Sequence, residues 1–279
     1  MRRLGLMVVA TVLAALALAP ASPAAPSPSD RWVLIVGIND YAGRTVDTVG
    51  AVGDAQDLAA YAARAGVPSD HVRVLTDRQA TAQAIRDGLR WLGDVSTDSS
   101  FSVFHYSGHV KQAGANDGDA EALDELLWGA DNRFIPDGEL AQWIKRIRGR
   151  SWTDIAGCEA AGFDDGISGP TRLFTSSSLE HEKSYEHPGW RNSIYTGLMV
   201  DQGMLQKRAD ADGNTRVSIQ EAFRYAEREA PRLTAGQSHG PQHPLLAGGD
   251  GTPWYLSVPK PPAPKQERTC LVVLRCAGS

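Results

Sequence analysis

The segments FSVFHYSGH, residues 101–109, and WTDIAGC, residues 152–158, share one pattern: a largely apolar run of strand length ends in a reactive side chain. Such runs are typical of strands that are buried on both faces of a parallel sheet. His109 comes just after the first run, and Cys158 comes just after the second. Because sites in parallel sheets form at the carboxyl ends of the strands, we expect the imidazole and the thiol to lie close together.

An imidazole beside a thiol favours nucleophilic catalysis, because the histidine converts the thiol into the reactive thiolate near neutral pH. The alternative is a structural histidine at His109 and a small buried apolar residue at Cys158. His105 and His109 also have an H-x-x-x-H spacing. In an extended segment, steps of about 3.3 Å separate these imidazoles by roughly 13 Å, which is too far for them to share a metal ion.

Helical and strand patterns alternate through the rest of the chain. The predicted strands cover residues 32–38, 71–75, 101–106, 152–156 and 172–175, and the predicted helices cover residues 53–65, 81–92, 137–147, 192–201 and 218–229. Gly66 follows the first helix, where a helix C-terminus favours glycine. This alternation predicts an α/β fold with a mostly parallel central sheet and helices on both faces.

The composition indicates a folded protein. The chain has 279 residues, of which 42% are hydrophobic and 22% charged, and this is sufficient for one large globular domain. Its formal net charge of −5 disfavours sequence-independent binding to nucleic acid, whose phosphates have the same sign. We therefore expect no nucleic-acid partner.

The N-terminus has the features of an export signal. Arg2 and Arg3 precede an apolar run, residues 4–18, and small residues of the kind that a signal peptidase recognises follow it. A retained membrane anchor is the alternative, but the run is shorter than the roughly 20 residues that a transmembrane helix needs. The protein is thus expected to be secreted or extracytoplasmic, without stable membrane association once the signal is cleaved. We expect a signal peptide at residues 1–24, a linker at 25–30, a folded domain at 31–258, and a Pro-rich linker with a cysteine-containing tail at 259–279.

The three cysteines fit this compartment. Cys270 and Cys276 lie near the C-terminus, and a closed loop of this size is sterically easy, so we expect them to form a disulfide in an oxidising environment. Cys158 then remains as the unpaired thiol.

Several short motifs occur together in a defined order. They are VLIVGINDY (residues 33–41), GDA (53–55), HYSGH (105–109), DEL (124–126) with Asp131, and GC (157–158). From Trp32 to about Tyr255 the chain thereby resembles the caspase-like cysteine peptidases, in particular bacterial metacaspases. The resemblance implies a three-layer sandwich around the central sheet and a cysteine endopeptidase that acts on peptides or proteins.

The resemblance also implies roles for individual residues. Cys158 would attack the scissile carbonyl, and His109 would protonate the leaving amine. The backbone N–H groups of Cys158 and of Gly108 or Val110 would stabilise the oxyanion. No third catalytic side chain is required.

Two positions depart from the family pattern. Val110 follows the histidine where the family has glycine, and Ala156 precedes the cysteine by two residues where the family has aspartate. That aspartate helps metacaspases accept a basic side chain at P1, the substrate residue before the cleaved bond. By resemblance Asp54 is the remaining substrate-binding carboxylate, so we expect a weakened preference for basic P1 residues. The alternatives are a helix-capping role for Asp54 and, for the whole chain, an inactive caspase-fold module that binds a partner or calcium.

Two acidic segments are calcium candidates. Asp210, Asp212, Asn214, Ser218 and Glu221 occupy positions 1, 3, 5, 9 and 12 of an EF-hand-like loop, with Thr215 in place of the usual glycine. The equally weighted alternative is a turn before a helix that Ser218 and Glu221 begin as a capping box. The second segment is a long loop that is either a calcium ligand set, as in many metacaspases, or simply solvated. Its acidic residues are Asp117, Asp119, Glu121, Asp124, Glu125 and Asp131.

Overall fold

The computed structural model describes residues 30–114 and 123–257. Three expectations lie outside the described residues: the signal peptide, the Pro-rich tail, and the pairing of Cys270 with Cys276. Three acids of the second calcium candidate, Asp117, Asp119 and Glu121, also lie outside them. Within the described part of the chain, no helix combines the length and the apolar character that crossing a bilayer requires.

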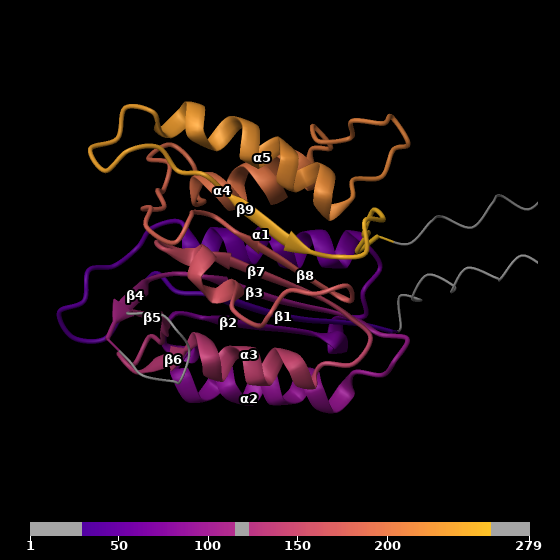
Figure 1. The fold of residues 1–279 in the computed structure, drawn as a ribbon, viewed down its shortest axis with the longest axis horizontal. Coiled ribbons are helices and arrows are strands. Elements are labelled where there is room, and N and C mark those ends of the chain that lie inside the picture. Colours follow the sequence, from indigo (N-terminus) through magenta and orange to yellow (C-terminus); the bar gives the residue numbers. More distant parts are fainter. Residues whose placement is uncertain (1–29, 115–122, 258–279) are drawn as a thin grey trace, which may run out of the picture.

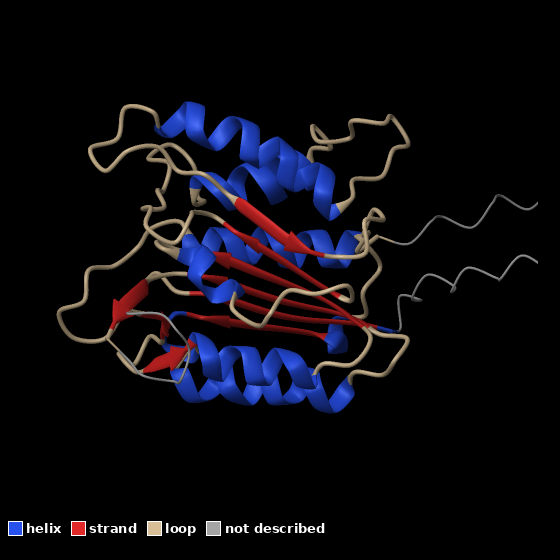
Figure 2. Ribbon diagram, viewed as in Figure 1, coloured by secondary structure: helices blue, strands red, loops and turns tan. Residues whose placement is uncertain are grey.

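The central sheet has six strands in the order β2-β1-β3-β7-β8-β9. The first five in this order are parallel, and β9 runs antiparallel to β8 at the edge of the sheet, where Figure 2 shows it in red. The mostly parallel sheet predicted from the sequence is therefore confirmed. The strands are β1 (Arg31–Gly37), β2 (Val72–Thr76), β3 (Phe101–Ser107), β7 (Arg150–Ala156), β8 (Arg172–Ser176) and β9 (Leu245–Gly248).

Helices cover both faces of the sheet and complete a three-layer sandwich (Figure 1). One face carries α1 (Ala51–Arg64), α4 (Ile194–Thr196), η5 (Gly197–Leu205) and α5 (Ile219–Thr234), and the other carries α2 (Ala82–Val95) and α3 (Asp137–Arg146). Short 3₁₀ helices are η2 (Ser69–His71), η3 (Asp77–Gln79) and η4 (Ala160–Asp164). Gly66 has φ +84° directly after α1 and its C-cap, as its position predicted.

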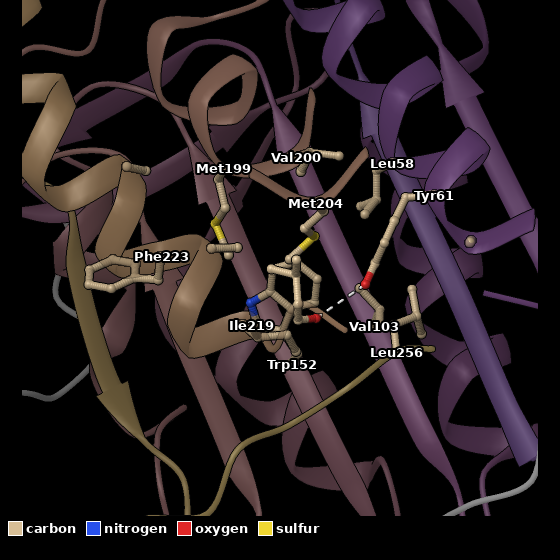
Figure 3. Close-up of a cluster of buried hydrophobic side chains, with 14 of the residues drawn as sticks. Leu58, Tyr61, Val103, Trp152, Met199, Val200, Met204, Ile219, Phe223 and Leu256 are labelled. Carbon is tan, nitrogen blue, oxygen red and sulfur yellow. Dashed lines mark hydrogen bonds between the residues drawn. The ribbon is translucent and has the colours of Figure 1, made fainter. Parts of the chain in front are cut away.

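Each face of the sheet has its own apolar core. On the α1 face the fully buried indole of Trp152 lies among Leu58, Met204 and Phe223 (Figure 3). On the opposite face α2 approaches β1 closely at Gly88, where a Cβ atom would come within 2.7 Å of the Leu34 side chain. Burial on both sides explains why the central strands read as continuous apolar runs.

Residues between 110 and 136 differ from the expected long loop. The described part forms an antiparallel sheet of β4 (Val110–Ala113), β5 (Asp124–Trp128) and β6 (Phe134–Pro136). The carboxyl groups of Asp124 and Glu125 suggested a solvated segment, yet both residues are buried at the start of β5. The predicted helix at residues 192–201 is also only partly right, because a single α-helical turn continues as the π-helix η5.

Strands β3 and β7 are held in register by a buried polar network. His105 pairs with Asp154 across the two strands, and their side chains are joined by an Nδ1–Oδ2 contact of 2.7 Å. Asp154 Oδ1 also accepts hydrogen bonds from the hydroxyls of Thr175, at 2.5 Å, and Tyr195, at 2.8 Å. His105 and Asp154 have no exposed surface, so this carboxylate relies entirely on protein donors.

We predict that Asp154→Ala lowers the free energy of unfolding by about 3 to 5 kcal/mol, because it leaves three buried donors without an acceptor. Urea titration of wild type and variant measures the difference. Asp98→Ala is the control, because Asp98 is a surface partner of Arg148 and its loss should change stability little. Equal losses in the two variants would contradict a structural role for the buried network.

Candidate active site

His109 and Cys158 line the same small pocket at the carboxyl ends of β3 and β7. Ser107 and Ala156 are paired residues in the last rung of these strands, and each reactive residue lies two positions beyond its strand's member of the pair. The pocket has a volume of about 130 Å³, which suits one side chain rather than a large ligand. Its lining residues are Thr48, Ala51, Ser107, Gly108, His109, Ala156, Gly157, Cys158, Ser184, Tyr185, Glu186 and Ser193.

Two tyrosines fix the backbone of His109. The Tyr41 hydroxyl accepts a hydrogen bond from the His109 N–H at 2.7 Å, and the Tyr106 hydroxyl donates to the His109 carbonyl at 2.5 Å. The imidazole Nε2 lies 2.6 Å from the carbonyl oxygen of Val46. The ring is therefore tied to the loop between β1 and α1 in this arrangement. Neither role was predicted from the sequence, although Tyr41 lies in the motif at residues 33–41 and Tyr106 in the motif at residues 105–109.

Serine side chains hold the loop that carries the cysteine. The Gly157 N–H donates to Ser177 Oγ at 3.0 Å, and the Gly157 carbonyl accepts from the hydroxyls of Ser177, at 2.8 Å, and Ser178, at 2.9 Å. The roles of Ser177 and Ser178 were not predicted from the sequence. The signal was the run of three serines, residues 176–178, at the end of a buried strand.

The thiol of Cys158 is partly sheltered. Burial raises the pKa of this thiol, the carboxylate of Glu159 acts in the same direction, and the ammonium group of Lys183 opposes it. Lys183 forms an ion pair with Glu159, so these two charges largely offset each other. The neutral thiol is therefore the resting form, and a proton acceptor is needed to produce the thiolate.

The backbone donors near the pocket differ in availability. The Gly108 N–H donates to the Ala156 carbonyl at 3.1 Å and extends the β3–β7 ladder, so Gly108 is wrong as an oxyanion donor in this arrangement. Val110 faces Leu127 in β4–β5, and Trp128 N–H donates to the His109 carbonyl. That pattern makes Val110 and Leu127 a non-hydrogen-bonded pair, which directs the Val110 N–H away from β5.

Asp54 lies behind the pocket rather than in its wall. It has no exposed surface, its Oδ2 accepts from Ser107 Oγ at 2.7 Å, and its Oδ1 accepts from Asn192 Nδ2 and from the Ser193 N–H, each at 3.1 Å. The N-cap of α1 is Gly50, so the capping alternative for Asp54 is wrong. Desolvation by burial raises the pKa of Asp54 to about 7, even though these donors lower it.

The EF-hand-like segment has features of both interpretations, a calcium ligand set and a turn before a capped helix. Ser218 and Glu221 form the predicted capping box of α5. Ligand oxygens of Asp210, Asp212 and Glu221 also lie within 4.8 Å of one another. Asn214 is less available, because its Oδ1 accepts from the Arg216 N–H at 2.8 Å.

The described acids of the second calcium candidate do not form such a group. Asp131 Oδ1 accepts from the Ala82 N–H at the start of α2, at 3.0 Å. Asp124 and Glu125 are buried in β5, and among the described residues the single cluster with the geometry of a metal site is that of Asp210, Asp212 and Glu221.

The sequence is similar to known proteins of one kind. Residues 30–148 match the caspase-domain family. Metacaspase-3 of Arabidopsis thaliana is 30% identical over 133 residues, which cover 43% of this chain and 36% of that protein. Metacaspase-1 of Cryptococcus neoformans is 29% identical over 194 residues, which cover 66% of this chain and 42% of that protein. The chain thus spans less than half the length of these relatives.

A solved structure supports the fold. A protein of Geobacter sulfurreducens with a known crystal structure aligns with a TM-score of 0.59 and 17% identity, over 83% of this chain and 95% of that chain. The layers, the strand-end pocket and the sequence matches define a caspase-fold protein. Residues 30–148 are thus similar to caspase domains, and parts of the chain are similar to metacaspases at about 30% identity, in agreement with the resemblance drawn from its motifs.

The raised pKa of Asp54 predicts a pH-dependent stability. Its ordinary value is 3.8 and its folded value is about 7, so the folded state binds this proton more tightly than the unfolded state. The resulting stability is fully present below about pH 3.8 and is lost as the pH rises through about 7, by up to roughly 1.4 kcal/mol per pH unit.

We predict that Asp54→Asn removes this dependence, because the amide has no proton to lose and its oxygen can still accept from Asn192 and Ser193. Urea titrations of wild type and variant between pH 4 and pH 8 measure it. The stability of wild type relative to the variant should fall between pH 4 and about pH 7 and then level off. A constant difference would show that Asp54 does not retain its proton in the folded state.

Proposed function

We propose that this protein is a cysteine endopeptidase that uses a Cys158–His109 dyad to cleave peptides or proteins. The observation that carries the proposal is the shared pocket: a thiol and an imidazole lie at the ends of neighbouring parallel strands, in one compact cavity. Both backbones are fixed by buried hydroxyl groups, so the two side chains act from defined positions.

The reaction begins from a protonated thiol, because burial raises the pKa of Cys158. The imidazole of His109 exchanges its contact with the Val46 carbonyl for the thiol and takes the thiol proton. The thiolate then attacks the scissile carbonyl, and the backbone N–H groups of Cys158 and Val110 stabilise the oxyanion. His109 gives the proton to the leaving amine, and water releases the acid product from the acyl-enzyme.

A second candidate is a caspase-fold module that binds a partner without cleaving it. The observations that favour it are Val110 and Ala156 at positions where metacaspases have glycine and aspartate, and the tie between His109 and Val46. Activity measurements on the dyad separate the two candidates.

We predict that Cys158→Ala and His109→Ala each lower kcat/KM for peptide cleavage by at least about 10³-fold, because the two residues act as one nucleophilic unit. Fluorogenic peptides with basic P1 residues provide the assay. His239→Ala is the control, because this exposed histidine lies outside the pocket and its loss should leave activity unchanged. Circular dichroism must show intact folding. A Cys158→Ala variant with most of the wild-type activity would overturn the mechanism.

We further propose that the enzyme prefers basic P1 residues and acts outside the cytoplasm. The first part is supported by Glu186, an acidic residue that lines the pocket. The second is supported by the N-terminal sequence, in which Arg2 and Arg3 precede an apolar run and small residues.

Calcium binding at the loop before α5 is a separate proposal. The donor set suits Ca²⁺, which prefers clustered carboxylate oxygens. Asp210 Oδ1 is buried and has no hydrogen-bond partner among the described residues, so an ion would satisfy it. Asp210, Asp212 and Glu221 would hold the ion, which would brace the connection between η5 and α5.

We predict that Ca²⁺ raises the Tm of the chelator-treated protein and that Asp212→Asn abolishes this shift. Saturation at 100 times Kd corresponds to about 2.7 kcal/mol of stabilisation. Thermal unfolding with EDTA, Ca²⁺ or Mg²⁺ measures the effect. Asp201→Asn is the control, because Asp201 lies in the middle of η5, outside the cluster. An equal Ca²⁺ shift in Asp212→Asn would reject this site.

A further inference from the structure

The two positions at which the family pattern expects acidic side chains, 156 and 54, place no carboxylate in the wall of the pocket. Ala156 lines the pocket at the position of the family's second acid and supplies no carboxylate. Asp54 is separated from the pocket by Ser107 and Ser193, which line it and donate to the Asp54 oxygens. Asp54 therefore cannot contact a substrate side chain without displacing these residues.

Glu186 is the single acidic side chain among the described residues that line the pocket. It lies on the segment between β8 and α4, and a backbone bridge to Ser193 anchors that segment beside the cavity. Its position therefore depends on the strand that follows the cysteine-bearing loop, as does the position of the serines that hold Gly157.

The carboxylate of Glu186 is fixed at the start of α1. Its oxygens accept from the Val49 N–H, at 2.8 and 3.0 Å, and from the Gly50 N–H. These amides belong to the helix N-terminus, where the helix dipole stabilises negative charge. A carboxylate can accept about four hydrogen bonds, so two amide donors leave it capacity for a further partner.

No cation in the described part of the chain neutralises the charge of Glu186. Two other carboxylates near the pocket have cationic partners: Glu159 pairs with Lys183, and Asp57 pairs with Arg191. Within residues 30–114 and 123–257, Glu186 has no ion-pair partner. The pocket has room for about one side chain and lies next to the nucleophile. The carboxylate of Glu186, which has no cationic partner there, complements a single positive charge on the substrate.

We propose that Glu186 receives the basic P1 side chain and replaces the carboxylate that Ala156 lacks, an inference that rests on the proposed peptidase function. The ligand class is a peptide with arginine or lysine at P1. Arginine is favoured, because its planar guanidinium can bond a carboxylate through two parallel hydrogen bonds, whereas lysine offers a point charge.

The test is a binding measurement that does not require turnover. Two fluorescein-labelled peptides, identical except for arginine or its uncharged isostere citrulline at P1, are titrated into the full-length Cys158→Ala protein. We expect the arginine peptide to bind about tenfold or more tightly, as for a hydrogen bond to a charged group. Adding Glu186→Gln should reduce this preference to within about twofold, because glutamine can still accept from Val49 and Gly50 but carries no charge.

Glu180→Gln is the matched control. It removes the same charge from the same segment, but Glu180 does not line the pocket, so the arginine preference should persist. If Glu186 had a purely structural role, Glu186→Gln would weaken the binding of both peptides equally. That result, or an arginine preference that survives Glu186→Gln, would overturn the inference.

Cleavage by the protein with Cys158 intact is measured in parallel. If the protein cleaves the peptides and its preference for arginine at P1 does not depend on Glu186, the proposed role of Glu186 is rejected and the peptidase function is retained. Absence of cleavage together with a Glu186-dependent arginine preference would reject the peptidase and establish Glu186 as the binding residue.

Discussion

The register between β3 and β7 is the constraint on which the site depends. His105 and Asp154 are paired across these strands, and the same register places Ser107 opposite Ala156 and then His109 near Cys158. A slip of one residue would turn every side chain of a strand to the opposite face of the sheet. It would also leave Asp154 without His105, its buried partner at 2.7 Å. One buried hydrogen bond therefore penalises the misalignment that would also separate the two reactive groups.

The reactive residues are positioned through their main chains. Tyr41 and Tyr106 bond the amide and carbonyl of His109, and Ser177 and Ser178 bond those of Gly157, directly before Cys158. This arrangement fixes where each side chain begins and leaves its rotation to local contacts. The imidazole can thus exchange the Val46 carbonyl for the thiol by turning about its own bonds. A buried thiol with a raised pKa remains unreactive until that exchange occurs.

The sequence predicted the parts that depend on local pattern. Apolar runs located the strands, and their ends located His109 and Cys158, because a strand buried on both faces has a strong signature. The β4–β6 sheet was missed because Asp124 and Glu125 are buried acidic residues, which residue type alone assigns to solvent. Glu186 was missed for another reason. Its role comes from contacts with Val49 and Gly50, 137 and 136 positions away, and no short motif records such a contact.

The two acids near the pocket show how burial, more than residue type, decides which one can bind a cation. Asp54 has three donors but no solvent, and desolvation raises its pKa to about 7, so much of its charge is lost near neutral pH. Glu186 is only half-buried and faces the cavity from a helix N-terminus. The acid that binds the cation lies on the segment after β8 instead of at the end of β7, where this chain has Ala156. This position does not affect the β3–β7 register. The pocket can therefore change its charge without disturbing the nucleophile, because the two depend on different elements.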